Sequence, residues 1–456
     1  MKINRITLIK PTIGTKSRNL YVDEGRMEPL QLGVIAALIP SDIDVVLVDD
    51  RMEKIPFDDP TDAVMITVET FTAKRAYEIS AEYRSRGIPV IMGGMHVRLA
   101  PFEVMEHCTS AVSGDAENII PLLIEDLKAN TLKKLYDCGV ADPPQQRLLT
   151  RRDLFSGKGY LPVTLMQFSR GCVHGCSYCA GSVYFNKKHY CRAVDEVAAE
   201  IKSQKRKLIF FVDDNFVADI ERAKALCRAL IPLKINWVSQ GTVNMVYDDE
   251  LMRLIVESGG MGFVIGFESI NPDSLSLMNK DINKELGVFN RYAKEVAILR
   301  RYGLQTWAAF TVGHDTDTIE NIKQTIEWAL KNKFTFAAFN ILMPYPQTEL
   351  YKQLEGEGRL LFDGKWWLHD DYRFNHAAFI PKNMTADELT ALSFYCRKRF
   401  NSPLAVFYRA FEPKTNMRTL KKFITYWLYN PLFRKEVHKK QGLKFGLNHF
   451  RGNADK

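Results

Sequence analysis

The chain has 456 residues, of which 46% are hydrophobic and 25% charged, and its formal net charge is +8. This composition is ordinary for a globular protein and excludes a disordered or fibrous chain. The length exceeds that of one ordinary domain, so we expect two or three domains. No apolar stretch approaches the ~20 residues that span a bilayer, and the first residues lack the pattern of a signal peptide. We therefore expect a cytoplasmic protein.

The first 130 residues alternate short apolar runs with helical patterns. We predict strands at Ile6–Ile9, Val45–Val48, Ala63–Val68, Pro89–Met92 and Ser110–Val112, and helices at Thr72–Ser85 and Ala116–Lys128. This alternation is typical of a doubly wound parallel sheet of the Rossmann-like α/β type. Ligands of such sheets lie beyond the carboxyl ends of the strands. Thr67, Gly93 and Gly94 lie there and are candidate cofactor-binding residues, with tight turns that bind no ligand as the alternative.

Residues 131–160 lose this periodicity and are expected to be a linker. A second alternating segment covers residues 161–350, with predicted strands at Val163–Phe168, Leu208–Val212, Ile235–Val238, Gly262–Phe267, Gln305–Val312 and Phe336–Met343. Six strand–helix units are too few for a complete eight-stranded barrel of about 250 residues. We predict a partial (β/α)6 barrel or an open sheet. Residues 351–456 are expected to be mostly helical, with a capped helix at Thr385–Arg399.

Three of the eight cysteines, Cys172, Cys176 and Cys179, lie within eight residues, directly after a predicted strand. The other five are scattered, and a reducing compartment would keep them as thiols. Three thiolates at this spacing can ligate three irons of a cubane cluster and leave the fourth iron open. Ferredoxin-type clusters need four cysteines, and structural zinc needs a fourth ligand. His174 lies inside the loop and could supply that ligand, so a zinc knuckle is the alternative.

The stretch Gly171-Cys-Val-His-Gly-Cys-Ser-Tyr-Cys-Ala resembles the signature of the radical S-adenosylmethionine (SAM) superfamily. The resemblance implies that the three cysteines hold a [4Fe–4S] cluster and that SAM binds its open iron. Reductive cleavage of SAM would then give methionine and a 5′-deoxyadenosyl radical. The resemblance also places Tyr178 against the adenine of SAM. It implies an external electron donor, either flavodoxin or ferredoxin.

Further residues match this superfamily at the ends of successive predicted strands. Asp213, with Asp214 as its alternative, lies where relatives bind the methionyl ammonium of SAM, a cation that a carboxylate suits. The competing interpretation of this pair is a solvated turn. Gln240 ends the third strand, and Glu268 ends the fourth, where it would bind SAM or form a salt bridge within the barrel. Gly313 ends the fifth and would permit close approach of adenine.

The N-terminal residues resemble one subfamily, which carries a cobalamin-binding-like domain before the barrel. The matching stretches include Ile91-Met-Gly-Gly-Met-His and Ser113-Gly-Asp-Ala-Glu-Asn, together with the turn Leu342-Met-Pro-Tyr-Pro-Gln-Thr-Glu-Leu-Tyr. The resemblance therefore adds cobalamin to the expected cofactors. The loop Lys10-Pro-Thr-Ile-Gly-Thr-Lys departs from the cobalt-ligating motif Asp-x-His-x-x-Gly because it has no histidine. Cobalamin would then bind without a protein ligand to cobalt.

The resemblance implies a radical SAM enzyme that methylates an unactivated carbon of a tetrapyrrole, lipid or natural-product precursor with the help of cobalamin. The first alternative is a cobalamin-independent oxidation, cyclisation or carbon–carbon bond formation. The second is a non-catalytic metal-binding scaffold. The substrate is expected to be a small molecule, and the candidate residues that would line its cavity are Trp366, His369 and Tyr372.

The C-terminal tail is basic and aromatic. Over Thr415–Tyr429, apolar residues such as Leu420 and Ile424 recur at helical spacing beside Arg418 and Lys421. Such a helix can lie on an anionic membrane surface, so peripheral membrane contact is one interpretation. A helix packed on the barrel with its charges in water is the other. No nucleic-acid recognition fold accompanies the charge, so we expect no nucleic-acid partner.

Overall fold

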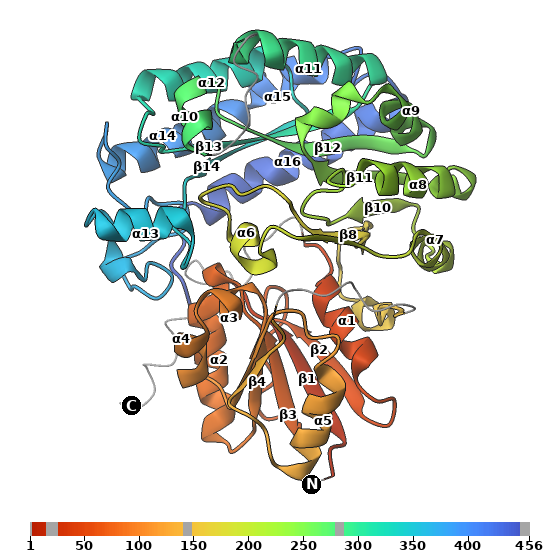
Figure 1. The fold of residues 1–456 in the computed structure, drawn as a ribbon, viewed down its shortest axis with the longest axis vertical. Coiled ribbons are helices and arrows are strands. Elements are labelled where there is room, and N and C mark those ends of the chain that lie inside the picture. Colours follow the sequence, from red (N-terminus) through yellow and green to blue (C-terminus); the bar gives the residue numbers. More distant parts are fainter. Residues whose placement is uncertain (1, 15–25, 140–147, 279–286, 447–456) are drawn as a thin grey trace.

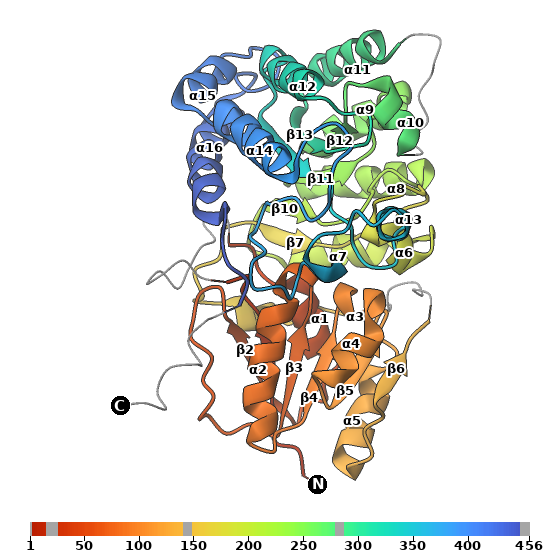
Figure 2. The ribbon, with the colours of Figure 1, turned by 90° about the vertical axis from the view of Figure 1, so that its left-hand side faces the viewer.

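The structure is a computed structural model that describes residues 2–14, 26–139, 148–278 and 287–446. It consists of two α/β units, one stacked on the other, with the C-terminal helices along one side of the second (Figures 1 and 2). No helix among the described residues is long and apolar enough to cross a membrane.

The N-terminal unit is a parallel sheet between two layers of helices. Its strands are β1 (Arg5–Lys10), β2 (Asp44–Asp49), β3 (Ala63–Thr67), β4 (Val90–Gly93), β5 (Ser110–Ser113) and β6 (Leu135–Asp137), in the order β2-β1-β3-β4-β5-β6. Helices α1 (Leu30–Leu38) and α5 (Ile120–Ala129) cover one face, and α2 (Ala73–Ser85), α3 (Met95–Leu99) and α4 (Pro101–Glu106) cover the other. The predicted doubly wound sheet is confirmed. The order of its first five strands is the flavodoxin-like 2-1-3-4-5.

One strand of this sheet lies in the expected linker. β6 pairs in parallel with β5, so residues 131–160 supply the sixth strand as well as a connection. The strand has only three residues, too few to show an apolar period. The sequence therefore placed the end of the N-terminal unit several residues too early.

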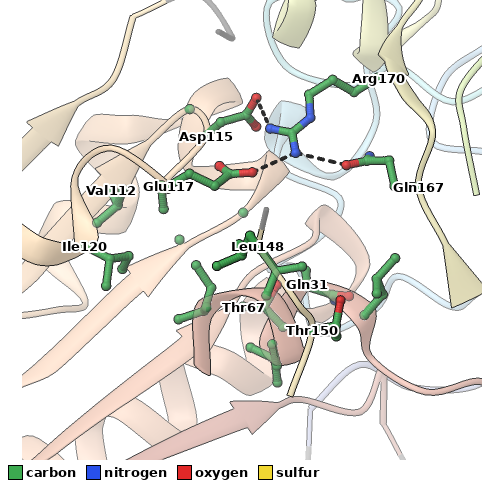
Figure 3. A pocket seen from close by; sticks show the side chains of 18 of the residues that line it. Gln31, Thr67, Val112, Asp115, Glu117, Ile120, Leu148, Thr150, Gln167 and Arg170 are labelled. Carbon is green, nitrogen blue, oxygen red and sulfur yellow. Dashed lines mark hydrogen bonds and ion pairs between the residues drawn. The ribbon is translucent and has the colours of Figure 1, made fainter. Parts of the chain in front are cut away.

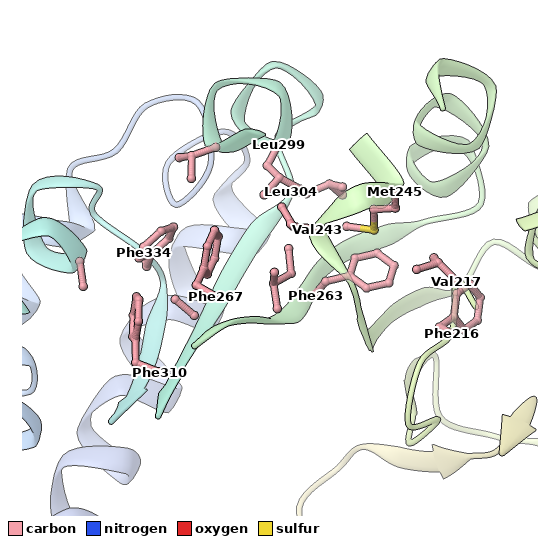
Figure 4. Close-up of a cluster of buried hydrophobic side chains, with 14 of the residues drawn as sticks. Phe216, Val217, Val243, Met245, Phe263, Phe267, Leu299, Leu304, Phe310 and Phe334 are labelled. Carbon is pink, nitrogen blue, oxygen red and sulfur yellow. The ribbon is translucent and has the colours of Figure 1, made fainter. Parts of the chain in front are cut away.

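The second unit is the partial barrel. Its strands are β7 (Thr164–Met166), β10 (Leu208–Phe211), β11 (Asn236–Gly241), β12 (Gly260–Glu268), β13 (Gln305–Val312) and β14 (Phe336–Ile341), all parallel, with β7 and β14 at the two edges. The connecting helices are α7 (Val194–Ser203), α8 (Ile220–Leu230), α9 (Asp249–Glu257), α10 (Pro272–Leu277), α11 (Val288–Tyr302) and α12 (Ile319–Lys331). A core rich in phenylalanine, with Phe216, Phe263, Phe267 and Phe310, joins sheet to helices (Figure 4). This arrangement confirms the predicted six-stranded partial barrel.

The C-terminal region is mostly helical, as predicted. Its helices are α13 (Glu349–Gly356), α14 (Ala386–Phe400), α15 (Pro403–Ala410) and α16 (Leu420–Lys440). The predicted cap of α14 is confirmed, because Thr385 and Glu388 form a reciprocal capping box.

The irregular segment before α14 packs against the N-terminal unit. Trp366 and Tyr372 are fully buried in the same core as α2, and the Trp366 indole donates to the carbonyl of Pro344. Trp367 donates to Glu103 of α4. Trp366 and Tyr372 therefore join the two units, and our suggestion that they line a substrate cavity was wrong for these two residues.

Candidate functional site

The cysteine loop is closed at its base by a short ribbon. β8 (Ser169–Gly171) and β9 (His189–Cys191) pair antiparallel, with Gly171 opposite His189. A side chain at Gly171 would meet the carbonyl of Lys188 at 2.1 Å, so only glycine permits this closure. Residues 172–188 thus form a loop beside the first barrel strand, and α6 (Ala180–Phe185) begins directly after Cys179.

The three predicted cluster ligands lie in this loop, partly buried and outside any disulfide. The Asn215 amide, which follows β10, donates to Cys172 Sγ over 3.7 Å. In the described part of the chain, no three His, Cys, Asp or Glu side chains are placed to bind one metal ion together. A cubane does not need such convergence, because each of its cysteines binds a different iron.

Asp213 supports the base of the loop. Its carboxylate is fully buried and accepts hydrogen bonds from the Phe168 amide (2.9 Å), the Ser169 amide (2.9 Å) and the Ser169 hydroxyl (2.7 Å). Gln240 donates to the backbone carbonyl of Asp213. Burial raises the pKa of Asp213 to about 7, although these hydrogen bonds act in the opposite direction. Both carboxylate oxygens are therefore engaged with protein donors.

Asp214 differs from its neighbour in exposure. It accepts one hydrogen bond from the Gly171 amide (2.8 Å), through a single carboxylate oxygen, and its side chain is exposed. Enough protein surrounds it for burial to raise the pKa of its carboxyl. The structure therefore favours Asp214, our second choice, as the residue that can meet a cation beside the cysteine loop.

Glu268 ends β12 in a strained conformation. Its φ is +63°, and the β12–β13 register shifts beside it, which points to a constraint at this position. Its carboxylate accepts from the Thr311 hydroxyl at 2.7 Å. Burial raises the pKa of Tyr178 well above its usual value. The negative charge of Glu268, and the hydrogen bond between the two side chains, act on this pKa in the same direction. Glu268 and Tyr178, both predicted SAM residues, are thus brought together.

His314 completes this polar group. Its ring lies edge-on to Tyr178 at 6.4 Å between centroids, and its backbone amide donates to Asp317. Its Nε2 is buried without a hydrogen-bond partner, as is Oδ1 of Asn215. Buried polar atoms are normally satisfied, so two such atoms near the cysteine loop fit a site that a ligand completes. The sequence pattern did not single out Asn215 as a site residue.

Gly313 packs against the C-terminal region. Its φ is +106°, and a side chain there would meet Leu389 of α14 at 2.6 Å and Phe379 at 3.3 Å. Its amide donates to Asp317. The glycine is therefore required by packing against the C-terminal region, and its contact with adenine stays a prediction.

A cavity of about 380 Å3 lies between the two units (Figure 3). The carboxyl ends of β3, β4 and β5 line it, including Thr67, Gly93 and Gly94. Gly94 has φ +112°, and a side chain there would meet the carbonyl of Val68 at 2.8 Å. The three predicted residues of the N-terminal unit are thus brought together at one cavity. Its N-terminal wall is mainly apolar, with residues such as Ile35, Met65, Ile91, Val112 and Ile120.

The opposite wall belongs to the barrel and carries charge. Arg170 precedes the cysteine loop and binds Asp115 (2.8 Å) and Glu117 (2.6 Å) of the loop after β5, as well as Gln167 (2.9 Å) (Figure 3). Tyr184 of α6 donates to Asp115. The cavity and the cysteine loop therefore share a wall. The sequence marks the loop after β5 only as a stretch that matches the subfamily, because a contact across two domains leaves no local signal.

Comparison with known proteins assigns the barrel to one superfamily. Residues 166–329 match the model of the radical SAM superfamily. Bacteriochlorophyllide d C-12(1)-methyltransferase of Chlorobaculum tepidum is 29% identical to this chain, over 84% of each. The C-8(2)-methyltransferase of the same organism is 26% identical over 90% of each. Hopanoid C-2 methylase of Rhodopseudomonas palustris is 24% identical over 84% of this chain and 73% of its own.

The fold has a solved counterpart. The radical SAM methyltransferase TsrM of Kitasatospora setae, with cobalamin and a [4Fe–4S] cluster bound, superposes with a TM-score of 0.61 and 18% identity over 78% of this chain and 76% of its own. One chain carries both the N-terminal sheet and the barrel. The barrel is therefore a radical SAM domain, and the chain is an enzyme whose two-unit fold matches that of a cobalamin-bound radical SAM methyltransferase.

Proposed function

We propose that this enzyme methylates an unactivated carbon of a tetrapyrrole or lipid, using cobalamin as well as SAM. The observation that carries the proposal is the cavity at the carboxyl ends of β3, β4 and β5, whose far wall continues into the cysteine loop through Arg170. A methyl carrier and a radical source must serve the same substrate, and this arrangement puts their two candidate sites on neighbouring elements. The relatives that match over most of their own length include methylases of a bacteriochlorophyllide and of a hopanoid.

In this proposal Cys172, Cys176 and Cys179 hold the [4Fe–4S] cluster. When bound, the cluster supplies the electron that cleaves SAM, and cobalamin supplies the methyl group. Asp214 takes the SAM ammonium, since its carboxylate is exposed and accepts one hydrogen bond, whereas that of Asp213 is fully buried and accepts three.

Four further residues complete the proposed SAM site. Glu268 and Tyr178 take the ribose and adenine side of SAM, with Thr311 orienting the carboxylate. Gln240 keeps the turn after β10 in place through its bond to the carbonyl of Asp213. Glu268 and Tyr178 would therefore touch the cofactor, whereas Gln240 acts as a positioning residue.

Thr67, Gly93 and Gly94 form the floor of the proposed cobalamin site. The cavity volume of about 380 Å3 is at the lower end of the range for drug-sized ligands, roughly 300–1,000 Å3. A whole corrinoid is larger, so it would extend beyond the cavity. The apolar N-terminal wall suits the edge of a large ring, and the absence of a side chain at Gly93 keeps the floor open.

The remaining partners belong to the same proposal. Reduction of the cluster needs an external one-electron donor of the flavodoxin or ferredoxin type. A tetrapyrrole or lipid substrate is apolar, so contact with a membrane through the C-terminal region is also proposed; the surface concerned is described below.

A second function is favoured by one relative. The anaerobic magnesium-protoporphyrin IX monomethyl ester cyclase of Cereibacter sphaeroides is 20% identical over 75% of this chain and 60% of its own length. Radical oxidation or cyclisation without methyl transfer is therefore the competing proposal. It uses the cluster and SAM residues in the same way, but any new bond forms between atoms of the substrate itself.

One anaerobic experiment separates these proposals. The enzyme is reconstituted with iron, sulfide and hydroxocobalamin, then supplied with dithionite, SAM carrying a deuterated methyl group, and either a bacteriochlorophyllide or a hopanoid. Methyl transfer predicts 5′-deoxyadenosine together with a product heavier by the labelled methyl group. 5′-Deoxyadenosine with an oxidised or cyclised product and no label would support the second function. Absence of 5′-deoxyadenosine, even with SAM bound, would contradict both.

A further inference from the structure

The outer face of α15 and α16 exposes a continuous group of apolar side chains. The exposed residues are Leu404, Phe407, Tyr408 and Phe411 in and after α15, Met417 in the following turn, and Leu420, Ile424 and Leu428 on α16. Leu404 is 82% exposed and Leu420 is 75% exposed, so these side chains have no partner in the described part of the chain that covers them. Figure 2 shows the two helices along one side of the barrel.

Ring contacts join the two helices into one surface. Phe407 lies 4.9 Å from Phe411 and 6.5 Å from Trp427 of α16, measured between ring centroids. Leu420, Ile424 and Leu428 follow each other at intervals of four residues, so they share one stripe of α16. Trp427 is adjacent to this stripe. We call the surface formed by these residues the α15–α16 face.

The edges of the α15–α16 face are basic. Lys414, Arg418 and Lys421 are exposed beside its apolar part, and Arg434 and Lys435 are exposed further along α16. A groove of about 550 Å3 connects Trp427 to Arg434 and Lys435.

The acidic residues of the same region do not offset this charge. Glu412 pairs with Arg300 at 3.8 Å, and Glu436 pairs with Lys440 one turn further on in α16. The face therefore combines large apolar side chains with a surplus of positive charge.

We propose that the α15–α16 face docks on an anionic lipid bilayer. Its apolar stripe would enter the boundary between headgroups and acyl chains, and its basic residues would bind lipid phosphates, as in other interfacial helices. Contiguous exposed apolar patches mark interaction sites in soluble folds. The patch extends well beyond the tail helix that the sequence indicated, because α15 and Phe411 after it contribute half of its residues.

A second copy of this chain fits the face less well. A two-fold interface would place the same patch against itself, and Arg418, Lys421, Arg434 and Lys435 would then oppose each other's copies. Like charges across an interface oppose association. An anionic bilayer satisfies both the apolar and the basic residues.

The test measures co-sedimentation of the full-length, cluster-loaded enzyme with vesicles of phosphatidylcholine alone or with added phosphatidylglycerol. We expect at least tenfold stronger partition into the anionic vesicles, and loss of this preference in high salt. The variant L420S/I424S/L428S should partition at least tenfold more weakly. The variant K421Q/R434Q/K435Q should lose roughly fivefold per charge on anionic vesicles, with no change on phosphatidylcholine.

Matched controls use exposed residues elsewhere. F102S/L122S/L277S removes exposed apolar side chains, and K202Q/K205Q/K207Q removes exposed lysines, from other surfaces. Both controls should bind vesicles like the wild type. 5′-Deoxyadenosine formation without vesicles should be the same in all variants, which shows that each is folded.

Three outcomes would overturn the proposal. These are equal partition into both vesicle types, an equal loss in the control variants, or a lipid-free dimer that L420S/I424S/L428S converts to a monomer without any vesicle binding by the wild type. The inference rests on the proposed function in one respect, because that function supplies the apolar substrate that membrane docking would serve. Vesicle binding needs no turnover, so its failure is distinguishable from failure of the methylation assay.

Discussion

The two sheets of this enzyme present opposite chemistry at their carboxyl ends. The barrel sheet ends in charged and polar residues, with Asp214, Glu268 and His314 around the cysteine loop. The N-terminal sheet ends in glycines and apolar side chains around a cavity. The end of the barrel sheet suits a small charged ligand whose polar groups each need a partner. The end of the N-terminal sheet suits a large ring that binds through shape complementarity. Arg170 joins the two ends through Asp115 and Glu117.

The largest expected effect comes from removing a cluster ligand at the barrel end. Cys176→Ala should abolish 5′-deoxyadenosine formation, with a loss of more than about 10³-fold, since the cluster would lose one of its three thiolates. The visible absorption of the reconstituted cluster should fall in parallel. Cobalamin retention should persist, because the N-terminal cavity does not depend on this residue. A variant that still cleaved SAM would disprove the cluster assignment.

The adjacent carboxylates of the barrel end should separate by function. Asp214→Asn should weaken SAM binding by about 10- to 100-fold, the scale of one charge-assisted hydrogen bond of about 1.5–3 kcal/mol, while the melting temperature changes little. Asp213→Asn should lower the melting temperature, because an amide cannot accept all three hydrogen bonds. Equilibrium binding of SAM and thermal unfolding measure the two effects. The opposite pattern would show that Asp213, and not Asp214, binds the SAM ammonium.

The N-terminal end can be blocked without touching the barrel. A side chain at Gly93 meets nothing closer than 3.9 Å at its first carbon, so Gly93→Leu should fold and extend into the cavity. We expect cobalamin retention to fall about tenfold, in line with an overpacking cost of about 1–3 kcal/mol, while 5′-deoxyadenosine formation continues. Gly356→Leu, at an open helix end, is the matched control. Equal cobalamin retention in both variants would show that cobalamin does not bind in this cavity.

The smallest effect concerns the junction between the units. Burial would raise the pKa of Glu103, but hydrogen bonds from His96, Trp367 and Tyr77 lower it to about 2. Its stabilising contribution is therefore present above about pH 4.5 and is lost as the pH falls toward 2. Glu103→Gln should reduce the free energy of unfolding by about 1–3 kcal/mol at pH 6. The difference from wild type should shrink on acidification; a constant difference would show that the carboxylate charge is irrelevant.

Local patterns predicted the elements of this comparison, but not its contacts. The cysteine triplet could be found because its ligands lie in one continuous motif, and the sheet ends because apolar runs mark each strand. The choice between Asp213 and Asp214 could not be made, since neighbouring residues point to opposite sides and only the backbone path decides which faces the loop. The packing of Gly313 against Leu389 of α14 was not predicted, because nothing in the motif of Gly313 reveals it. The Arg170–Asp115 pair was missed for the same reason.

The central claim is that one chain holds both cofactors at facing sites. It is tested most directly by electron paramagnetic resonance of the enzyme loaded with both, with the cluster reduced and the cobalt in its Co(II) state. The account predicts a magnetic interaction between the two centres, which disappears in Gly93→Leu as cobalamin is lost while the cluster signal remains. Two independent signals without interaction, or a full cluster signal with no bound cobalamin in the wild type, would contradict it.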